Sequence, residues 1–342
     1  MIQIKDKVFI IAELSANHNG DLQVALETVR AAKRAGADAI KLQTYTAKTM
    51  TIDCKNDFFM IKQDTAWDGE YLYDLYKRAY TPWEWHKNIY DLAKEEGLIC
   101  FSSPFDNSAV DLLEELNSPI YKIASFEITD IPLIEYTASK GKPMIISTGI
   151  ADIEDIELAI ETCKKVGNND ITILKCTSAY PADPIDANLL TIPDIKERFR
   201  VKVGLSDHTM GIEGPVVATT LGATVIEKHF ILDKSIGGAD AHFSLDEEEF
   251  TKMVNSVRKA EEMIGKVDYE MTEKKKKSRQ FSRSLFVVKD VKNGDQITLE
   301  NVRSIRPGFG LHPKYLSQII GKEFNQDIDK GTPLSLKDIN NY

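Results

Sequence analysis

The stretch VGLSDHTMGIEGPVVATTLGATVIEKHF, residues 203–230, holds most of one strand, a helix and a second strand. VKVGLS and ATVIEKHF are short runs rich in β-branched and apolar residues, and residues 213–221 between them have the pattern of a helix. In such a unit the strands are parallel neighbours, so their carboxyl ends lie about 4.8 Å apart. His208 and His229 stand at these ends, and we expect them to be either two ligands of one metal ion or a pair of structural histidines.

Runs of this kind recur along the chain, and each is followed by a helical pattern. They are VFIIAEL, AIKLQTY, ICFSSPF, YKIAS, MIISTG, ITILKCTS, VKVGLS and TVIEKHF. Eight β-α units within about 260 residues predict an α/β fold, the (β/α)8 TIM barrel. A doubly wound open sheet is the main alternative, but no GxGxxG follows the first run.

The pattern stops after the barrel, and the chain changes character. We predict a catalytic barrel over residues 1–268, a charged linker over 269–280 and a small β-rich domain over 281–342. The KKKK run in the linker is read as a solvated segment in preference to a binding patch. Residues 289–302 and 326–339 are two copies of one pattern, and each copy predicts a strand, a glycine turn and a second strand.

Composition narrows the class of protein. The chain has 342 residues, 42% of them hydrophobic, and a formal net charge of −10. This acidity disfavours general binding to nucleic acid or to an anionic membrane, because both need a basic face. The start of the chain lacks a long apolar segment, nowhere do 18 apolar residues follow one another, and the four cysteines form no CxxC pair. We therefore expect a cytoplasmic enzyme.

Polar and charged residues follow every predicted strand, at the end where TIM barrels carry their active sites. Lysines and carboxylates are almost never buried without partners, whereas a barrel mouth that binds an anionic, polyhydroxylated ligand needs them. The candidates are Glu13, Lys41, Gln43, Ser103, Lys122, Ser125, Glu127, Ser147, Ser178, Tyr180, Ser206, Asp207, His208, Glu227 and His229.

Two features indicate the kind of ligand. Lys41 and Lys122 lie on different strands among several hydroxyls, which suits a phosphate and a carboxylate on one small molecule. His208 and His229 supply two nitrogen ligands and leave other metal positions open for water and substrate, as a Lewis acid requires. With these polar residues around them, we favour the interpretation that the two histidines are metal ligands over the interpretation that they are structural.

The sequence leaves the roles of three further residues open. Asp207 and Glu227 either orient the imidazoles or pair with the lysines. His86, in WEWHK, lacks polar company and is expected to be a surface or packing residue.

The blocks AELSANHNG, KLQTYT, SSPFD, KIASFE, STGIA, CTSAYP, GLSDHT, EKHF and RSIRPGFGLHP occur in this order over nearly the whole chain. Together they resemble the sialic acid synthase family, whose barrel is followed by a small antifreeze-like (SAF) domain. The resemblance implies condensation of phosphoenolpyruvate with an acetamido sugar aldehyde. The products are a nine-carbon 2-keto acid and phosphate.

The resemblance also implies roles for single residues. His208 and His229 would hold a divalent metal, usually manganese, with magnesium or cobalt as alternatives. Residues that would bind phosphoenolpyruvate are Lys41, Ser103, Lys122, Ser125, Ser147, Ser178 and Ser206. Residues that would face the sugar and its proton transfers are Glu13, Gln43, Glu127, Tyr180 and Asp240, with Glu127 the favoured proton carrier. Arg306 would reach in from the SAF domain of a partner subunit, in a domain-swapped homodimer.

The identity of the sugar is the finest level of the prediction. SANH, KIASFE and RPGFGLHPK are most similar to the branch that uses 2,4-diacetamido-2,4,6-trideoxy-L-altrose. Ser15 and Ser178 depart from the branch that makes N-acetylneuraminate, and legionaminate synthesis is a further alternative. Apolar candidates for lining the sugar pocket are Phe126, Ala179, Ala182 and Phe243. Two rival classes are a metal-dependent keto-acid aldolase and a non-catalytic sugar-binding protein.

Overall fold

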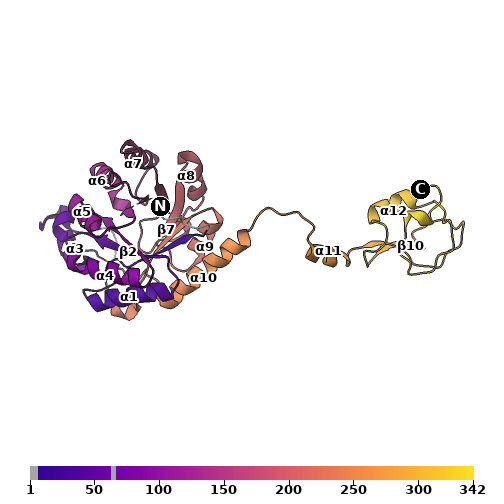
Figure 1. Ribbon diagram of the computed structural model, residues 1–342, viewed down its shortest axis with the longest axis horizontal. Helices are drawn as coiled ribbons and strands as arrows, with labels where there is room; N and C mark the ends of the chain where they lie inside the picture. Colours follow the sequence, from indigo (N-terminus) through magenta and orange to yellow (C-terminus); the bar gives the residue numbers. More distant parts are fainter. Residues whose placement is uncertain (1–6, 63–66) are drawn as a thin grey trace. The chain divides into compact units, whose positions relative to one another are not determined.

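The structure is a computed structural model that describes residues 7–62 and 67–342 (Figure 1). The chain divides into two compact units, Met1–Gly265 and Lys266–Tyr342. No helix in the described part of the chain is both long and apolar enough to cross a membrane.

The first unit contains a closed barrel in which eight parallel strands follow one another in sequence order, and β1 pairs with β8. The TIM barrel expected from the eight apolar runs is confirmed. Its strands are β1 (Phe9–Glu13), β2 (Ala39–Thr44), β3 (Ile99–Pro104), β4 (Tyr121–Ile123), β5 (Met144–Ser147), β6 (Ile171–Cys176), β7 (Lys202–Asp207) and β8 (Val225–His229).

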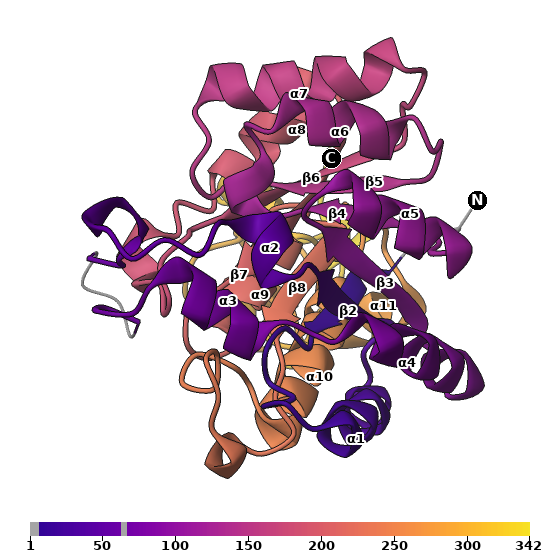
Figure 2. The same cartoon turned by 90° about the vertical axis from the view of Figure 1, so that its left-hand side faces the viewer.

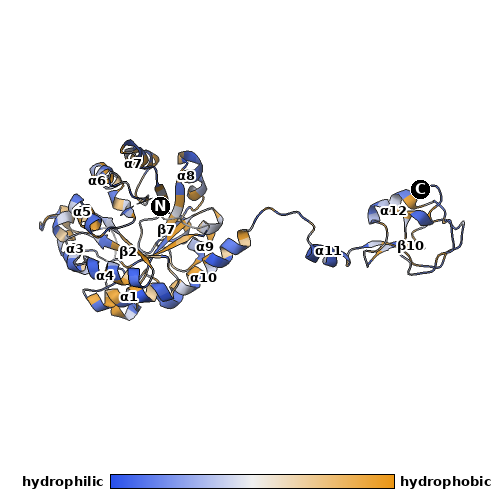
Figure 3. Cartoon of the chain, in the orientation of Figure 1, coloured by the Kyte–Doolittle hydropathy of each residue, from blue (hydrophilic) through white to orange (hydrophobic). Residues whose placement is uncertain are grey.

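Helices surround the barrel (Figure 2), and hydrophobic and hydrophilic residues are interspersed along them (Figure 3). Several begin at an aspartate whose carboxylate accepts a backbone N–H of the first turn, as Asp21, Asp106 and Asp152 do. The helices are α1 (Leu22–Arg34), α2 (Ala47–Met50), α3 (Leu72–Ala79), α4 (Trp83–Glu95), α5 (Asn107–Glu115), α6 (Ile131–Ala138), α7 (Ile153–Lys165), α8 (Thr191–Phe199), α9 (Glu213–Thr220) and α10 (Glu247–Ile264). The buried residues of α1 and α5 are almost all apolar.

The barrel interior is filled by side chains that alternate along the strands. Phe9, Ile11 and Phe101 belong to a buried apolar cluster that also includes Leu174 and Val225. On β1 and β8 this alternation continues into Glu13, Glu227 and His229, which follow the apolar residues at intervals of two. The same strands that close the apolar layer therefore end in charged side chains.

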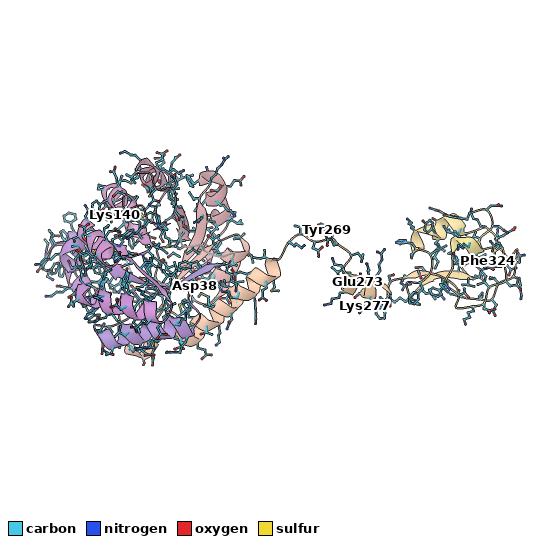
Figure 4. All side chains as sticks on the ribbon, viewed as in Figure 1. Asp38, Lys140, Tyr269, Glu273, Lys277 and Phe324 are labelled. Atoms are coloured by element: carbon cyan, nitrogen blue, oxygen red, sulfur yellow. The ribbon has the colours of Figure 1, made fainter. Side chains whose placement is uncertain are left out.

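At the amino end of the barrel, α10 is hydrogen-bonded to the residues that precede β1 and β2. The guanidinium of Arg258 donates to the Val8 carbonyl at 2.7 Å and to the Asp38 carboxylate at 2.8 Å. The same carboxylate accepts the backbone N–H of Ile10 at 2.8 Å, and Glu261 accepts the N–H of Val8. These contacts tie the last barrel helix to β1 and to the start of β2, beside Asp38 in Figure 4.

The second unit is built around β9 (Ser284–Val287) and β10 (Val302–Ile305), which pair antiparallel. Its core includes Leu285, Ile297 and Phe324, the last labelled in Figure 4. Two short helices are α11 (Glu273–Arg279), which falls within the predicted linker, and α12 (Leu316–Ile319).

The internal repeat of this unit is real, but its predicted strands are wrong. Val291 and Ile328 hold equivalent places in the two copies and exchange backbone hydrogen bonds of 3.0 Å, and Gly294 and Gly331 turn the chain with φ of 88° and 92°. Around the turns the structure has isolated bridges in place of strand pairs. Aspartates close these loops instead: Asp295 accepts the N–H of Lys292 at 2.7 Å, so the local backbone bonds to side chains and not to a ladder.

Candidate active site

Two buried lysines stand at the carboxyl end of the barrel. Lys41 on β2 contacts the Glu13 carboxylate at 2.5 Å and donates to the Ser103 hydroxyl at 3.3 Å. Lys122 on β4 donates to the Ile123 carbonyl at 3.1 Å. Their side chains are 3% and 2% exposed, so each ammonium group is held almost entirely by protein contacts.

Glu227 on β8 lies between these lysines. Its Oε1 atom is 3.8 Å from the Lys41 ammonium, 3.7 Å from the Lys122 ammonium, and accepts the Ser206 hydroxyl at 3.2 Å. Burial acts to raise the pKa of Glu227, but Lys122 and Lys41 outweigh it and lower that pKa. Burial lowers the pKa of Lys122. Glu227 thus takes the second of its two predicted roles, pairing with lysines.

A second cluster gathers serines from the end of β5 and from the segments that follow β4 and β6. The backbone N–H of Gly149 donates to the Ser125 hydroxyl at 3.1 Å. A Cβ atom on Gly149 would lie 1.9 Å from the Ser178 hydroxyl and 2.8 Å from that of Ser125, so only glycine lets the two loops meet here. The Ser147 hydroxyl is buried and has no hydrogen-bond partner in the described part of the chain. Hydroxyls and an N–H clustered in this way can cradle an oxyanion.

The two histidines lie together, as the β-α-β unit predicts, with ring centroids 5.3 Å apart. The Nδ1 atom of His208 faces the Thr177 carbonyl at 3.0 Å, which fixes Nδ1 as the protonated nitrogen and leaves Nε2 as the basic one. Burial, followed by the charge of His208, lowers the pKa of His229 well below its ordinary value. Its Nδ1 atom is buried without a hydrogen-bond partner among the described residues.

The histidine pair fits a divalent cation in part. Such ions bind imidazole in its neutral form, often with a carbonyl behind the ring. The lowered pKa of His229 fits this form, whereas burial, which acts to lower the pKa of His208, is outweighed by Cys176, so that pKa is raised. Within residues 7–62 and 67–342, no group of three or more histidine, cysteine, aspartate or glutamate side chains forms a complete metal site. One further carboxylate borders the pair, that of Asp240, whose Oδ2 atom is 3.8 Å from His229 Nδ1. The remaining positions of a bound ion would therefore belong to water and substrate.

Sugar-facing candidates border the histidines. The Tyr180 ring lies 4.4 Å from that of His208 and 5.2 Å from that of Phe243. Asp240 accepts a hydrogen bond from the Ser15 hydroxyl at 2.5 Å. Burial raises the pKa of Asp240, although Ser15 opposes it. Of the predicted apolar linings, Phe243 packs on this group, whereas Phe126 is 57% exposed.

Glu127 and Gln43 are the remaining predicted site residues of the first unit. Gln43 donates to Glu13 at 3.1 Å, beside Lys41. Burial raises the pKa of Glu127 to about 7, although Lys122 opposes the shift, and its Oε2 atom has no hydrogen-bond partner in the described residues. Arg306 is exposed and belongs to the second unit.

Sequence reasoning missed Lys228 and the contact of Cys176 with His208, whereas His86 takes one of its two expected roles. Lys228 contacts Asp207 at 2.5 Å, so Asp207 also pairs with a lysine and does not orient an imidazole. Cys176 lies 3.7 Å from His208 Nδ1. His86 is a packing residue, buried on α4 and hydrogen-bonded to Thr44 at 2.8 Å. Strand alternation could have found Lys228, because it is offset by one residue from the inward-facing Glu227 and His229.

Buried lysines, clustered hydroxyls and a pair of imidazoles at the mouth of a TIM barrel are typical of an enzyme that acts on a small anionic substrate. Residues 28–269 match the NeuB family and residues 282–340 match the SAF domain. The chain belongs to the NeuB family, which confirms the resemblance drawn from the sequence blocks.

Named relatives extend over nearly the whole chain. It is 49% identical to pseudaminic acid synthase of Campylobacter jejuni over 97% of this chain and 96% of that protein. It is 50% identical to pseudaminic acid synthase of Helicobacter pylori over 96% of this chain and 97% of that protein. Among solved structures, it is similar to N-acetylneuraminic acid synthetase of Leptospira borgpetersenii in complex with citrate. The identity is 32%, the TM-score 0.71, and 80% of this chain and 90% of that chain are covered.

Proposed function

We propose that the chain is a pseudaminic acid synthase. It condenses phosphoenolpyruvate with 2,4-diacetamido-2,4,6-trideoxy-L-altrose and water, and releases pseudaminic acid and phosphate. The observation that carries the reaction class is one barrel mouth with two buried lysines and a histidine pair. Relatives named as pseudaminic acid synthases, at 49% and 50% identity, support the choice of sugar.

Phosphoenolpyruvate carries a phosphate and a carboxylate, and the mouth offers a cation for each. We assign Lys41 and Lys122 to these anions because both ammonium groups are buried at the mouth. Lys122 has three N–H donors, and among the described residues they contact only the Ile123 carbonyl and Glu227, which leaves one donor for an anion. Further donors come from five successive strands or the loops that follow them, as the hydroxyls of Ser103, Ser125, Ser147, Ser178 and Ser206. Binding an anion here would also offset the burial that lowers the pKa of Lys122.

His208 and His229 are proposed to hold the divalent metal, with manganese the favoured ion. When bound, such an ion acts as a Lewis acid that polarises the sugar aldehyde. The Thr177 carbonyl orients the ring of His208 at 3.0 Å. The aldehyde carbon would face the enol carbon of phosphoenolpyruvate across the mouth.

Glu127 is proposed to move the proton that the new bond requires. The enol C3 carbon attacks the aldehyde carbon, and the aldehyde oxygen takes a proton to become a hydroxyl. Water then adds to the C2 cation and loses a proton, and the adduct expels phosphate by C–O cleavage, leaving the 2-keto group. A carboxyl whose pKa is raised to about 7 by burial can donate and recover a proton near neutral pH.

The acceptor sugar is assigned to the side of the mouth formed by Tyr180, Asp240 and Gln43. The altrose carries a 6-methyl and a second acetamido group, which suit some apolar lining. Phe243 supplies it, 2% exposed and 4.7 Å from the His229 ring by centroids.

The deciding experiment offers purified protein phosphoenolpyruvate and Mn²⁺ with each of three sugars. These are the altrose, the 2,4-diacetamido trideoxy-mannose precursor of legionaminic acid, and N-acetylmannosamine. We expect phosphate release and the product mass of pseudaminic acid with the altrose. Preference for another sugar would move the chain to that branch, while cleavage of a keto acid without phosphate would make it an aldolase. Sugar binding without turnover would indicate the non-catalytic rival.

Assembly is a separate part of the proposal. We infer a domain-swapped homodimer in which Arg306 of the SAF domain completes the partner's site, as the family resemblance implies. Arg306 is exposed, and its loop is fixed by the bond from Gly308 N–H to the Gln280 carbonyl at 2.9 Å. Mixed Arg306→Ala and His229→Ala subunits should form hybrids with one working site. Failure to regain activity after confirmed exchange would place Arg306 outside the partner's site.

The compartment is proposed from cysteine chemistry. All four cysteines, Cys54, Cys100, Cys163 and Cys176, are free thiols, and three of them are buried. Free thiols suit a reducing compartment, so we place the reaction in the cytoplasm. Labelling of all four by a thiol reagent in unfolded protein taken from cells, without prior reduction, would support this.

A further inference from the structure

Ser15 lies in a backbone conformation that its side chain disfavours. Its φ angle is 48°, in the left-handed region where glycine is at ease and serine is strained, and its surface is 3% exposed. It directly follows Leu14 in the loop after β1, at the mouth of the barrel. A non-glycine residue in this conformation indicates that its side chain has a role, which for Ser15 means its hydroxyl.

The surrounding loop over-determines this conformation. Asn17 donates to the Phe230 carbonyl at 2.9 Å and to the Ser244 hydroxyl at 2.8 Å. Ser244 in turn donates to the Asp240 carbonyl at 2.7 Å, and His18 bonds Thr81 at 3.1 Å. The loop after β1 is thereby fastened to the loop after β8, so the left-handed residue holds a fixed place opposite Asp240.

The Ser15 hydroxyl donates to Asp240 Oδ2 at 2.5 Å. That oxygen also lies 3.8 Å from Nδ1 of His229, and Asp240 is 8% exposed. Ser15 and His229 thus flank one oxygen of a buried carboxylate. A hydrogen bond to a charged acceptor is strong enough to select one rotamer of a short side chain.

We propose that Ser15 is a positioning residue that holds the Asp240 carboxylate in place for the acceptor sugar. It acts through Asp240, which accepts N–H or O–H groups of a polar acetamido sugar. The proposal rests on the proposed function, because it assigns the acceptor to the Asp240 side of the mouth. Phosphoenolpyruvate is assigned to the lysines and serines, so its binding should not depend on Ser15.

Ser15→Gly separates this role from a structural one. Glycine relieves the φ strain while it removes the hydroxyl, so a purely structural serine would be replaced without loss or with a gain in stability. If Ser15 positions Asp240, the variant should likewise keep or raise its melting temperature, but it should lose affinity for the acceptor sugar. The expected increase of the acceptor KM is about tenfold, the size of a lost hydrogen bond to a carboxylate. The KM for phosphoenolpyruvate and the Mn²⁺ affinity should stay within about twofold.

Asn19→Gly is the matched control. Asn19 lies in the same loop with φ of 44°, and its side chain donates to the Ile236 carbonyl at 3.1 Å and not to Asp240. This variant also replaces a left-handed residue of the same loop by glycine and removes a side-chain hydrogen bond, but not one to Asp240. It should leave the acceptor KM unchanged.

A double-mutant cycle with Asp240→Asn completes the test. Because Ser15 acts through the carboxylate, Ser15→Gly should have little further effect in the Asp240→Asn background. Additive losses in the cycle, an unchanged acceptor KM in Ser15→Gly, or an equal loss in Asn19→Gly would each overturn the inference while leaving the synthase reaction intact. Absence of wild-type turnover with all three sugars would overturn the proposed function and this inference together.

Discussion

The ion pairs at the two ends of the barrel differ in burial and in separation. At the amino end Arg258 pairs with Asp38 at 2.8 Å, with side chains 23% and 39% exposed. At the carboxyl end Lys122 and Glu227 lie 3.7 Å apart with side chains 2% and 7% exposed. The Arg258–Asp38 pair is close and partly exposed to solvent, and both side chains also bond to backbone groups at or next to β1. The Lys122–Glu227 pair has a longer separation and is almost fully buried.

This difference separates stability from function. A partly exposed pair that also satisfies backbone groups costs little desolvation, so it can stabilise the fold. Burying two charges costs several kcal/mol per ion, and hydrophobic replacements are often as stable or more so. We therefore attribute the buried charges at the mouth to substrate binding. The charges at the amino end, which we call the base of the barrel, we attribute to the attachment of α10 to the strands.

Removal of the metal should have the largest effect at the mouth. Chelation should abolish phosphate release, and Mn²⁺ should restore it to wild-type protein but not to His229→Ala, which loses one of two imidazole ligands. Direct Mn²⁺ binding, measured by electron paramagnetic resonance, should weaken in the variant. Full turnover by metal-stripped protein would remove the metal from the mechanism.

Glu127→Gln should have the next largest effect. As the proton donor, Glu127 is active when protonated, so wild-type kcat should fall as pH rises through about 7. The variant should lose about a hundredfold in kcat and lack this limb of the pH profile. An unchanged limb in the variant would assign it to another group.

The same raised pKa has a consequence for stability. Since folding favours the protonated form, wild-type stability gained from Glu127 is present at low pH and decreases as pH rises from the unfolded value through about 7. Glu127→Gln should flatten this dependence when the unfolding free energy is measured against pH.

A single methyl group at the oxyanion cradle should have a smaller effect. In Gly149→Ala the new Cβ atom would lie 1.9 Å from the Ser178 hydroxyl, so that side chain must rotate away. We expect the KM for phosphoenolpyruvate to rise about tenfold, the loss of one or two hydrogen bonds to an anion. An unchanged KM would show that the cradle binds no part of this substrate.

At the base of the barrel we expect no effect on catalysis. Arg258→Met should lower the free energy of unfolding by about 1–2 kcal/mol, because Asp38 and the Val8 carbonyl lose their partner. Its kcat and both KM values should match the wild type at 25 °C. A change in either KM would mean that the base communicates with the mouth.

Sequence reasoning reached the barrel and the composition of its mouth, since strand periodicity and the polar end of each strand are local properties. The meeting of His208 and His229 followed from one β-α-β unit. The SAF strands were mispredicted because their backbone bonds go to aspartate side chains and single bridges. The position of Glu227 between two lysines depends on barrel closure, which pairs β8 with β1, next to β2, and places β4 across the barrel. The sequence therefore left its role open.

The most direct test of the account replaces each charge pair as a unit and measures two quantities. Lys122→Met with Glu227→Gln should raise the Kd for phosphoenolpyruvate about tenfold or more, with an unfolding temperature equal to or above that of the wild type. Arg258→Met with Asp38→Asn should leave that Kd unchanged and lower the unfolding temperature. Calorimetric titration and thermal unfolding of both double variants, side by side, provide the comparison. If both lose affinity together, or both lose only stability, the division of labour between the two ends of the barrel is contradicted.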